Sequence, residues 1–151
     1  MATKSAATED ATAAFSQALH DFFRASRRAR GRAARRPSPS GLSMAQYHLV
    51  EPLAEAPSTN RDLAASADVS SPTATRMIDV LISRGVVTRM EDPTDRRAVL
   101  ISLTPAGRAA LETKMREYEA MRMQMAATLE PEEQRVAADL LARITEVIEE
   151  L

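Results

Sequence analysis

The sequence is poor in several residue types that build common functional sites. Its 151 residues contain no cysteine, no tryptophan, only four glycines and 3% aromatic residues. Without cysteine the chain forms no disulfide, no thiolate metal site and no thiol-based redox sensor. Four glycines also leave little room for a glycine-rich phosphate-binding loop. The absences argue against redox and nucleotide chemistry.

Long apolar runs and targeting signals are missing as well. No uninterrupted apolar run approaches the roughly 20 residues that a membrane helix needs. The N-terminal residues 1–14 show no basic stretch followed by an apolar stretch, as a secretory signal would. The length suits one domain, or one domain with an appended helical arm. We therefore expect a cytoplasmic protein that does not bind membranes.

The charge is balanced overall and uneven along the chain. The formal net charge is -1, yet residues 20–36 hold seven arginines against the single acid Asp21. Residues 59–108 hold seven arginines and six acids, and residues 109–151 hold ten acids and five bases. The N-terminal arginines either extend a basic surface toward nucleic-acid phosphates or pair with the acidic C-terminal region of either chain in a dimer. The sequence leaves both interpretations open.

Helical periodicity marks two segments in the first third of the chain. Phe15, Leu19, Phe22 and Phe23 recur at helical spacing, which predicts an amphipathic helix over residues 10–30, ending near a Pro/Ser/Gly loop at 37–41. A second helix is predicted from about 43 to 54, with Ser43 as its cap. Pro52 lies inside it and predicts a kinked or short helix, because proline cannot donate the helix hydrogen bond.

Two short helices with clear start signals follow. Residues 59–62 match the capping pattern that opens a helix, and Ser70 or Ser71 caps a second helix with Pro72 as its first position. That helix is predicted to reach Arg84, followed by Gly85 as a left-handed residue. Two such helices joined by a short turn indicate a helix-turn-helix.

The periodicity then changes from helix to strand. Residues 86–90 and 98–103 read as two strands around a turn cluster at 92–95, which predicts a β-hairpin directly after the helix-turn-helix. Thr104 and Pro105 open a long helix to about Leu129, and Pro131 starts a last helix with a strong apolar stripe. The predicted fold class is mainly α with a small β-hairpin wing, that is, a winged helix-turn-helix.

The hairpin and the helix after it resemble those of one family of transcriptional regulators. The segments Asp92-Pro93-Thr94-Asp95-Arg96-Arg97 and Leu100–Arg108 resemble the wing and following helix of the MarR family. Upstream, Leu63-Ala64, Val69-Ser70, Thr75-Arg76 and Gly85-Val86-Val87 are similar to its winged helix. The segment Leu42–Tyr47 is similar to its second helix. The resemblance covers roughly residues 15–150.

The resemblance implies a homodimer whose terminal helices interlock and hold two winged helices over pseudo-palindromic double-stranded DNA. The apolar stripes of the first and last helices support this, since a small winged helix alone cannot cover them. We expect a flexible N-terminus over 1–9 and a first dimerisation helix with a basic segment over 10–36. The DNA-binding region would span 42–104, and the C-terminal dimerisation helices 105–151.

The candidate DNA-binding residues on the recognition helix are Ser71, Thr73, Thr75 and Arg76. Arginine can bond guanine, and threonine can bond a base or touch a thymine methyl group. Two of these residues could instead have purely structural roles. Ser71 could serve only as a helix cap, and Arg76 could pair with Asp79, three residues further along the helix.

The wing supplies the candidates Asp95, Arg96 and Arg97. Arg97 matches the arginine that the family inserts into the minor groove, and Asp95 matches the acid that holds it in place. Arg96 is expected to meet a phosphate, which adds affinity without reading sequence. Alternatively, these residues form an ordinary surface hairpin with an exposed ion pair.

The predicted function is a dimeric, sequence-specific DNA-binding regulator, in particular a repressor released by a small aromatic or anionic effector. The alternative is a winged helix that binds proteins and does not read DNA. We expect no enzyme, because no catalytic or nucleotide-binding motif stands out. No cofactor is expected, and His20 and His48 without cysteine predict no metal site.

Overall fold

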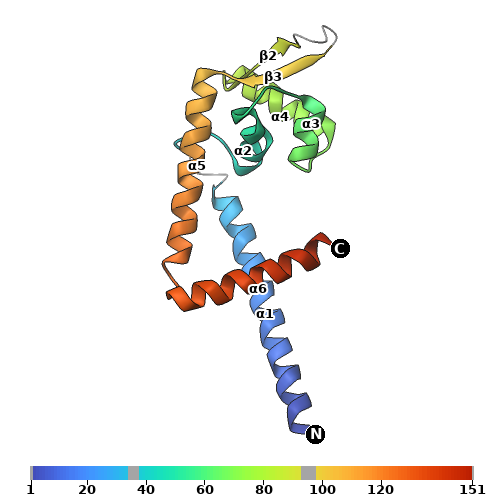
Figure 1. Cartoon of the computed structure of the whole chain (residues 1–151), viewed down its shortest axis with the longest axis vertical. Coiled ribbons are helices and arrows are strands. Elements are labelled where there is room, and N and C mark those ends of the chain that lie inside the picture. Colours follow the sequence, from blue (N-terminus) through green and yellow to red (C-terminus); the bar gives the residue numbers. More distant parts are fainter. Residues whose placement is uncertain (1, 34–37, 93–97, 151) are drawn as a thin grey trace.

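The computed structural model describes residues 2–33, 38–92 and 98–150, and it is mainly helical with one small sheet (Figure 1). The α-helices are α1 (Ala2–Ala33), α2 (Met44–Val50), α3 (Asn60–Ser66), α4 (Ser71–Ser83), α5 (Pro105–Ala126) and α6 (Pro131–Glu149). A 3-10 helix, η1 (Glu51–Ala54), follows α2, and the strands are β1 (Ser58–Thr59), β2 (Val87–Glu91) and β3 (Val99–Leu103). The predicted fold class is confirmed.

The winged helix surrounds a single apolar core. The sheet is antiparallel in the order β1-β3-β2, with Arg89 of β2 and Ser58 of β1 both opposite Ile101 of β3. Strand β1 was missed from the sequence because two residues carry no periodicity. The core consists of Leu42, Tyr47, Leu49, Val50, Leu53, Leu63, Ala64, Ala74, Ile78, Leu81, Val86, Val87, Ile101 and Leu111.

Side-chain caps fix the helix starts around this core. The Ser43 hydroxyl accepts a hydrogen bond from the Gln46 amide, and the Gln46 side chain bonds back to the Ser43 backbone as a capping box. Thr59 and Thr104 cap α3 and α5 as predicted, with hydroxyls that accept hydrogen bonds from the Asp62 and Gly107 amides. Pro52 ends α2 at Val50 and leaves η1 beyond it, which confirms the predicted short helix.

The start of α4 corrects one prediction. Ser70 is the cap, and its hydroxyl accepts a hydrogen bond from the Thr73 amide, whereas Ser71 is the first helical residue. Pro72 therefore occupies the second helical position, where its missing N–H is still not needed by the helix. At the other end of α4, Gly85 has the predicted left-handed conformation, with φ of +70°.

Helix α1 starts earlier than predicted. It runs from Ala2 to Ala33, so residues 2–9 are helical and not merely a polar lead-in to residue 10. Six of residues 2–14 are alanine, which has the highest helix propensity of any residue, so this segment can be helical without an apolar stripe.

The terminal helices lie outside the winged-helix core. In Figure 1, α5 descends from the wing, and α6 crosses α1 partway along its length, near the lower end of α5. No side chain of α6 is buried, and none of the described side chains from 8 to 32 in α1 is buried. Met121, Met123 and Met125 are likewise exposed on α5, so they do not belong to the core of this chain.

Candidate nucleic-acid interface

Helix α4 turns one side into the core and the other to solvent. Ala74, Ile78 and Leu81 are buried at helical spacing. The predicted site residues Ser71, Thr73, Thr75 and Arg76 are all exposed. Because the apolar residues hold one side of the helix against α3 and the wing, the four polar residues are left exposed around the rest of the first turns of the helix. The structure thus brings together the four candidates predicted on this helix.

The hydroxyl groups at the start of α4 differ in their engagement. The Ser70 and Thr73 hydroxyls lie 2.8 Å apart and share a hydrogen bond. The Ser71 side chain has no hydrogen-bond partner within residues 2–33, 38–92 and 98–150. Because Ser70 performs the capping, the interpretation of Ser71 as a mere cap is wrong. The Ser71 hydroxyl is available to an external group.

Arg76 does not form the ion pair that the sequence offered as its alternative role. Asp79 instead accepts a hydrogen bond of 2.7 Å from the guanidinium of Arg89, on strand β2. Arg76 has no ion-pair partner in the described part of the chain. The Asp79–Arg89 pair is about half exposed on both sides, so it adds little stability, but it gives the Asp79 carboxylate a partner other than Arg76.

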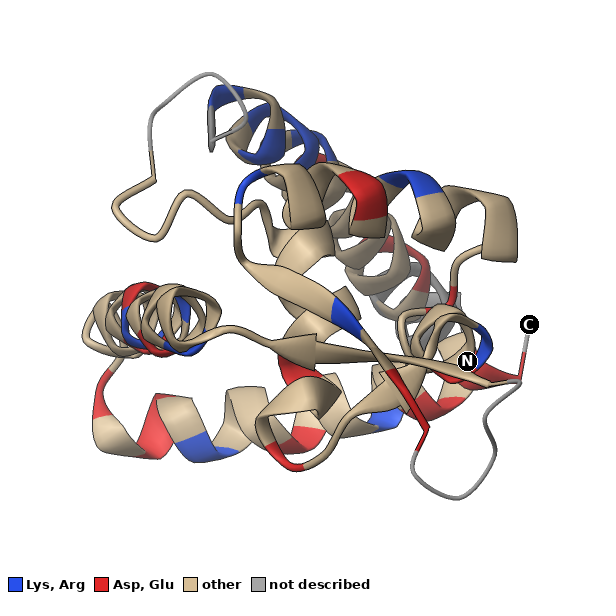
Figure 2. Cartoon of the chain, turned by 90° about the horizontal axis from the view of Figure 1, so that it is seen from above, with Lys and Arg blue, Asp and Glu red and all other residues tan. Residues whose placement is uncertain are grey.

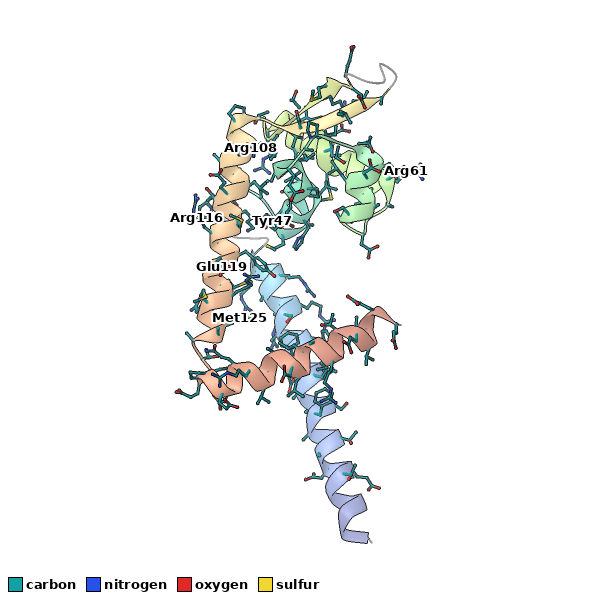
Figure 3. All side chains as sticks on the ribbon, in the orientation of Figure 1. Tyr47, Arg61, Arg108, Arg116, Glu119 and Met125 are labelled. Atoms are coloured by element: carbon teal, nitrogen blue, oxygen red, sulfur yellow. The ribbon has the colours of Figure 1, made fainter. Side chains whose placement is uncertain are left out.

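Two basic residues near this surface were missed from the sequence. Arg89 lies on β2 beside α4, and Arg61 lies exposed in the first turn of α3. Figure 3 shows Arg61 on the outer side of α3, away from α5. An arginine on a strand or in a capping turn gives no periodic signal, so only the folded structure shows that Arg89 lies beside α4 and that Arg61 is exposed on the neighbouring helix.

The wing candidates Asp95, Arg96 and Arg97 lie outside the described residues. The two strands that lead to them are described, and the Asp92 amide donates a hydrogen bond of 3.1 Å to the Ala98 carbonyl oxygen. The hairpin predicted at 86–103 is therefore confirmed as far as Asp92 on one strand and Ala98 on the other.

A polar cluster joins the loop after α1 to α5. The Glu117 carboxylate accepts hydrogen bonds from the Ser40 amide at 2.9 Å, from the Ser38 hydroxyl at 2.8 Å and from Lys114 at 3.0 Å. Burial alone would raise the pKa of Glu117, but these hydrogen bonds and the Lys114 charge outweigh it, and the pKa is lowered below its usual 4.5. The cluster holds an ionised carboxylate between the two segments.

A second contact between α2 and α5 is aromatic. The Tyr47 and Tyr118 ring centroids lie 6.4 Å apart, and the Arg122 guanidinium lies 5.4 Å from the Tyr118 centroid. The Tyr47 hydroxyl donates a hydrogen bond of 2.8 Å to Glu51. Burial and this bond to a carboxylate raise the pKa of Tyr47. Aromatic rings and an arginine thus meet where the winged helix contacts α5, at the position where Figure 3 labels Tyr47.

The basic segment of α1 is a separate feature. Figure 2 shows lysine and arginine gathered at the end of α1 that leads toward residues 34–37. Arg24 pairs with Asp21 in the same helix at 2.8 Å. Within the described residues, no arginine of α1 pairs with an acid of α6. Ion pairs between α1 and α6 of one chain are therefore not observed among the described residues. Contact of the α1 arginines with DNA phosphates stays a prediction.

An apolar groove lies between α1 and α6. Its volume is about 680 Å³, and it is lined by Phe15, Leu19, Phe23, Leu140, Arg143, Ile144, Val147 and Ile148. Phe15 and Val147 are 55% and 59% exposed. Large apolar side chains so exposed on two neighbouring helices mark a surface for association.

Two kinds of site are absent from the described residues. No three histidine or acidic side chains among them lie together in a way that could hold a metal ion. No helix in those ranges is long and apolar enough to span a membrane.

Comparison with known proteins agrees with this geometry. The model of the MarR family matches residues 42–99. The HTH-type transcriptional regulators YdgJ and YhbI of Bacillus subtilis are 33% and 30% identical to the chain, over 70% and 74% of its length. The chain spans 65% of YdgJ and 73% of YhbI.

A solved structure has the same fold. Streptococcus pneumoniae FabT, determined in complex with DNA, is 24% identical and superposes with a TM-score of 0.63. The match covers 72% of this chain and 77% of FabT. At this identity the likeness shows the shared fold.

Proposed function

The chain belongs to the MarR family of HTH-type transcriptional regulators, and we propose that it is a dimeric, sequence-specific DNA-binding repressor that a small molecule releases. The observation that carries the proposal is that Arg76 is exposed and has no ion-pair partner among the described residues. This arginine is exposed near the start of the recognition helix α4, while the acid within its reach, Asp79, is bound to Arg89. A guanidinium in that position can bond a guanine edge or a phosphate.

The neighbouring side chains support the same surface. Ser71 has an unengaged hydroxyl within the described residues, and Arg61 adds a positive charge on the adjacent helix α3. The structure of FabT with DNA supports DNA as the partner of this fold. Membership of a family of regulators also agrees with the expectation that the chain is not an enzyme.

The wing residues belong to the proposal. We place Arg97 in the minor groove, Asp95 beside it as the group that orients the guanidinium, and Arg96 on a phosphate. A narrow A·T-rich minor groove concentrates negative potential and attracts arginine. The hairpin of β2 and β3, which carries these residues, projects beside α4 (Figure 1).

A second copy of the chain is proposed to cover the apolar groove between α1 and α6. The groove is lined by side chains from both terminal helices, as interlocking helices require. Two-fold symmetry would then present two α4 helices to a pseudo-palindromic site. Successive major grooves on one face of DNA lie about 34 Å apart, so the spacing of the two helices decides binding.

The effector is proposed to act where the winged helix meets the terminal helices. Tyr47, Tyr118 and Arg122 place aromatic rings and a positive charge at this junction. A small aromatic anion would stack on the rings and compete for the Arg122 guanidinium with Glu119, with which it is paired at 2.5 Å. Such a ligand releases DNA only if it binds more tightly to a form of the dimer in which the two α4 helices no longer match the spacing of successive major grooves. The protein would act in the cytoplasm, where its DNA is.

The test is a fluorescence-anisotropy titration of the whole protein with the duplex that flanks its own gene, and with a random duplex. Specific binding should weaken with salt, and each neutralised phosphate adds about 0.9 to the log–log slope. Arg76→Ala should lose about 1–3 kcal/mol of binding free energy. Arg116→Ala, on the outer side of α5 (Figure 3), is the matched control and should bind normally.

Equal affinity for both duplexes would overturn the proposal and favour a protein-binding winged helix. If specific binding is found, adding benzoate as an aromatic anion tests the junction. Release of DNA that is lost in Arg122→Ala supports the effector site. Release unchanged in that variant places the effector elsewhere.

A further inference from the structure

The hydroxyl of Thr75, on the exposed side of α4, is already engaged within the protein. It donates to the Ser71 carbonyl oxygen at 2.9 Å, one helical turn earlier. It also accepts a hydrogen bond of 3.1 Å from the Asn60 side-chain amide nitrogen, which reaches across from α3. A threonine hydroxyl has one proton and two lone pairs. Its proton and one lone pair are therefore used before any ligand arrives.

The orientation of the Asn60 amide does not change this conclusion. If the amide is rotated so that its oxygen faces Thr75, the hydroxyl proton goes either to that oxygen or to the Ser71 carbonyl. In both orientations the only proton of the Thr75 hydroxyl remains inside the protein. Thr75 cannot donate a hydrogen bond to a base without breaking an existing one.

The side chain of Asn60 is not needed to cap or stabilise α3. Thr59 caps that helix, because its hydroxyl accepts a hydrogen bond from the Asp62 amide. The Asn60 side-chain oxygen is buried and has no hydrogen-bond partner in the described residues. A buried amide oxygen without a partner is destabilising. The one side-chain hydrogen bond that the structure gives Asn60 is the bond to Thr75.

The surroundings of Thr75 are apolar on the side of the wing. Thr75 and Asn60 line a cleft of about 340 Å³ together with Ile78, Arg89, Val99 and Ile101. Two branches leave the Cβ atom of threonine, and the hydroxyl branch is held by Ser71 and Asn60. The hydroxyl keeps one lone pair and no proton for an external group, whereas the γ-methyl group has no hydrogen bond to hold it back from an apolar contact.

We propose that Thr75 recognises thymine in the major groove through its γ-methyl group, and that Asn60 is a positioning residue that fixes the Thr75 side chain for this contact. The inference rests on the proposed function and names one base that the recognition helix reads. Apolar contact between a threonine methyl and the 5-methyl group of thymine is an established mode of readout.

The test uses two variants and one base analogue. Thr75→Val keeps the branched shape and the methyl but removes the hydroxyl, and Thr75→Ser keeps the hydroxyl but removes the methyl. Deoxyuridine in place of thymine removes only the 5-methyl group of the base. Affinities are measured for the whole protein and the duplex flanking its gene, with each thymine replaced in turn.

The wild-type protein should lose about fourfold in affinity at one thymine of each half-site, the effect of one buried methyl group. Thr75→Val should keep both the affinity and this sensitivity. Thr75→Ser should bind about fourfold more weakly and be insensitive to the replacement. If Thr75→Ser binds normally and Thr75→Val does not, or if both behave like the wild type, the inference is overturned.

The positioning role of Asn60 has its own readout. Asn60→Ala should reduce the discrimination between thymine and deoxyuridine without lowering the stability measured by urea unfolding. In the Thr75→Val background, Asn60→Ala should have no further effect on discrimination, because valine offers no hydroxyl to hold. Unchanged discrimination in Asn60→Ala would overturn its role. Failure of the wild type to prefer this duplex over a random one would instead overturn the proposed function.

Discussion

The guanidinium of Arg84 donates a hydrogen bond of 2.6 Å to the carbonyl oxygen of Gly41. Arg84 caps the C-terminal end of α4, and Gly41 lies in the loop that follows α1. In the same loop, the Ser40 amide and the Ser38 hydroxyl donate hydrogen bonds to Glu117 on α5. A continuous set of polar contacts therefore connects α4 to α5 and holds the orientation of one helix relative to the other.

Gly41→Ala should destabilise the protein by about 1–2 kcal/mol, because Gly41 has a φ of +68° that L-residues rarely adopt. An added Cβ would also lie 2.6 Å from the Arg84 guanidinium nitrogen. Urea unfolding followed by circular dichroism measures the loss. The control is Gly31→Ala in α1, where nothing lies within 4 Å, and it should be neutral or stabilising by up to about 1 kcal/mol.

Gly107→Ala should have a larger effect, at least about 3 kcal/mol. An added Cβ would lie 1.8 Å from the backbone carbonyl oxygen of Val86, which no side-chain rotation can relieve. The same unfolding measurement applies. A folded variant of wild-type stability would contradict the close approach of α5 to the strand entry at Val86.

Glu117→Gln should reduce stability at neutral pH and flatten its dependence on pH. Because the folded-state pKa of Glu117 is lowered, its contribution is present above the ordinary pKa of 4.5 and is lost as the pH falls through the folded value. Urea unfolding at pH 7, 5, 4 and 3 should show the wild type approaching the variant below pH 4.5. Glu112→Gln controls for the loss of a carboxylate from α5. An equal gap between wild type and variant at every pH would refute the account.

The winged helix was predictable because its signals are local. Thr59, Ser70 and Thr104 cap helices by contacts within three residues, and the buried positions of α4 recur at helical spacing. Strand β1 was not predictable, because it depends on pairing with β3 from far along the chain. The early start of α1 was not predictable either, because it depends on alanine propensity alone.

The candidate site was predictable in membership but not in its contacts. The sequence placed Thr73, Thr75, Arg76 and Asp79 on the side of α4 opposite its apolar residues, and all four are exposed. It could not tell that Asp79 pairs with Arg89 on β2, or that Asn60 reaches Thr75 from α3. Both contacts depend on how separate elements pack, and sequence spacing carries no information about that.

Ile148→Glu should abolish the proposed dimer. Ile148 lines the groove between α1 and α6 and is 53% exposed in the single chain, so a carboxylate there would be buried by a partner. Val136→Glu is the matched control: it lies on the same helix, is 52% exposed and does not line the groove. Sedimentation should give a monomer for the first and a dimer for the second. If both variants sediment as dimers, the proposed interface is wrong.

Arg97→Ala should weaken binding most for sites whose flanks are A·T-rich, because the narrow minor groove there holds arginine best. Anisotropy with A·T-flanked and G·C-flanked versions of one duplex measures the difference. Arg96→Ala should instead weaken binding to both versions equally and lower the salt slope by about 0.9, as loss of one phosphate contact does. If Arg97→Ala also affects both versions equally, Arg97 does not read the minor groove.

The lack of buried side chains in α6 and along residues 8–32 of α1 has a consequence for how the protein responds to its own abundance. If a second chain supplies the missing cover, the apolar sides of these helices are protected only when two copies meet. Below the dissociation constant of the pair, the amount of active regulator then rises with the square of the chain concentration. A modest change in expression would shift operator occupancy more sharply than a single-chain repressor could.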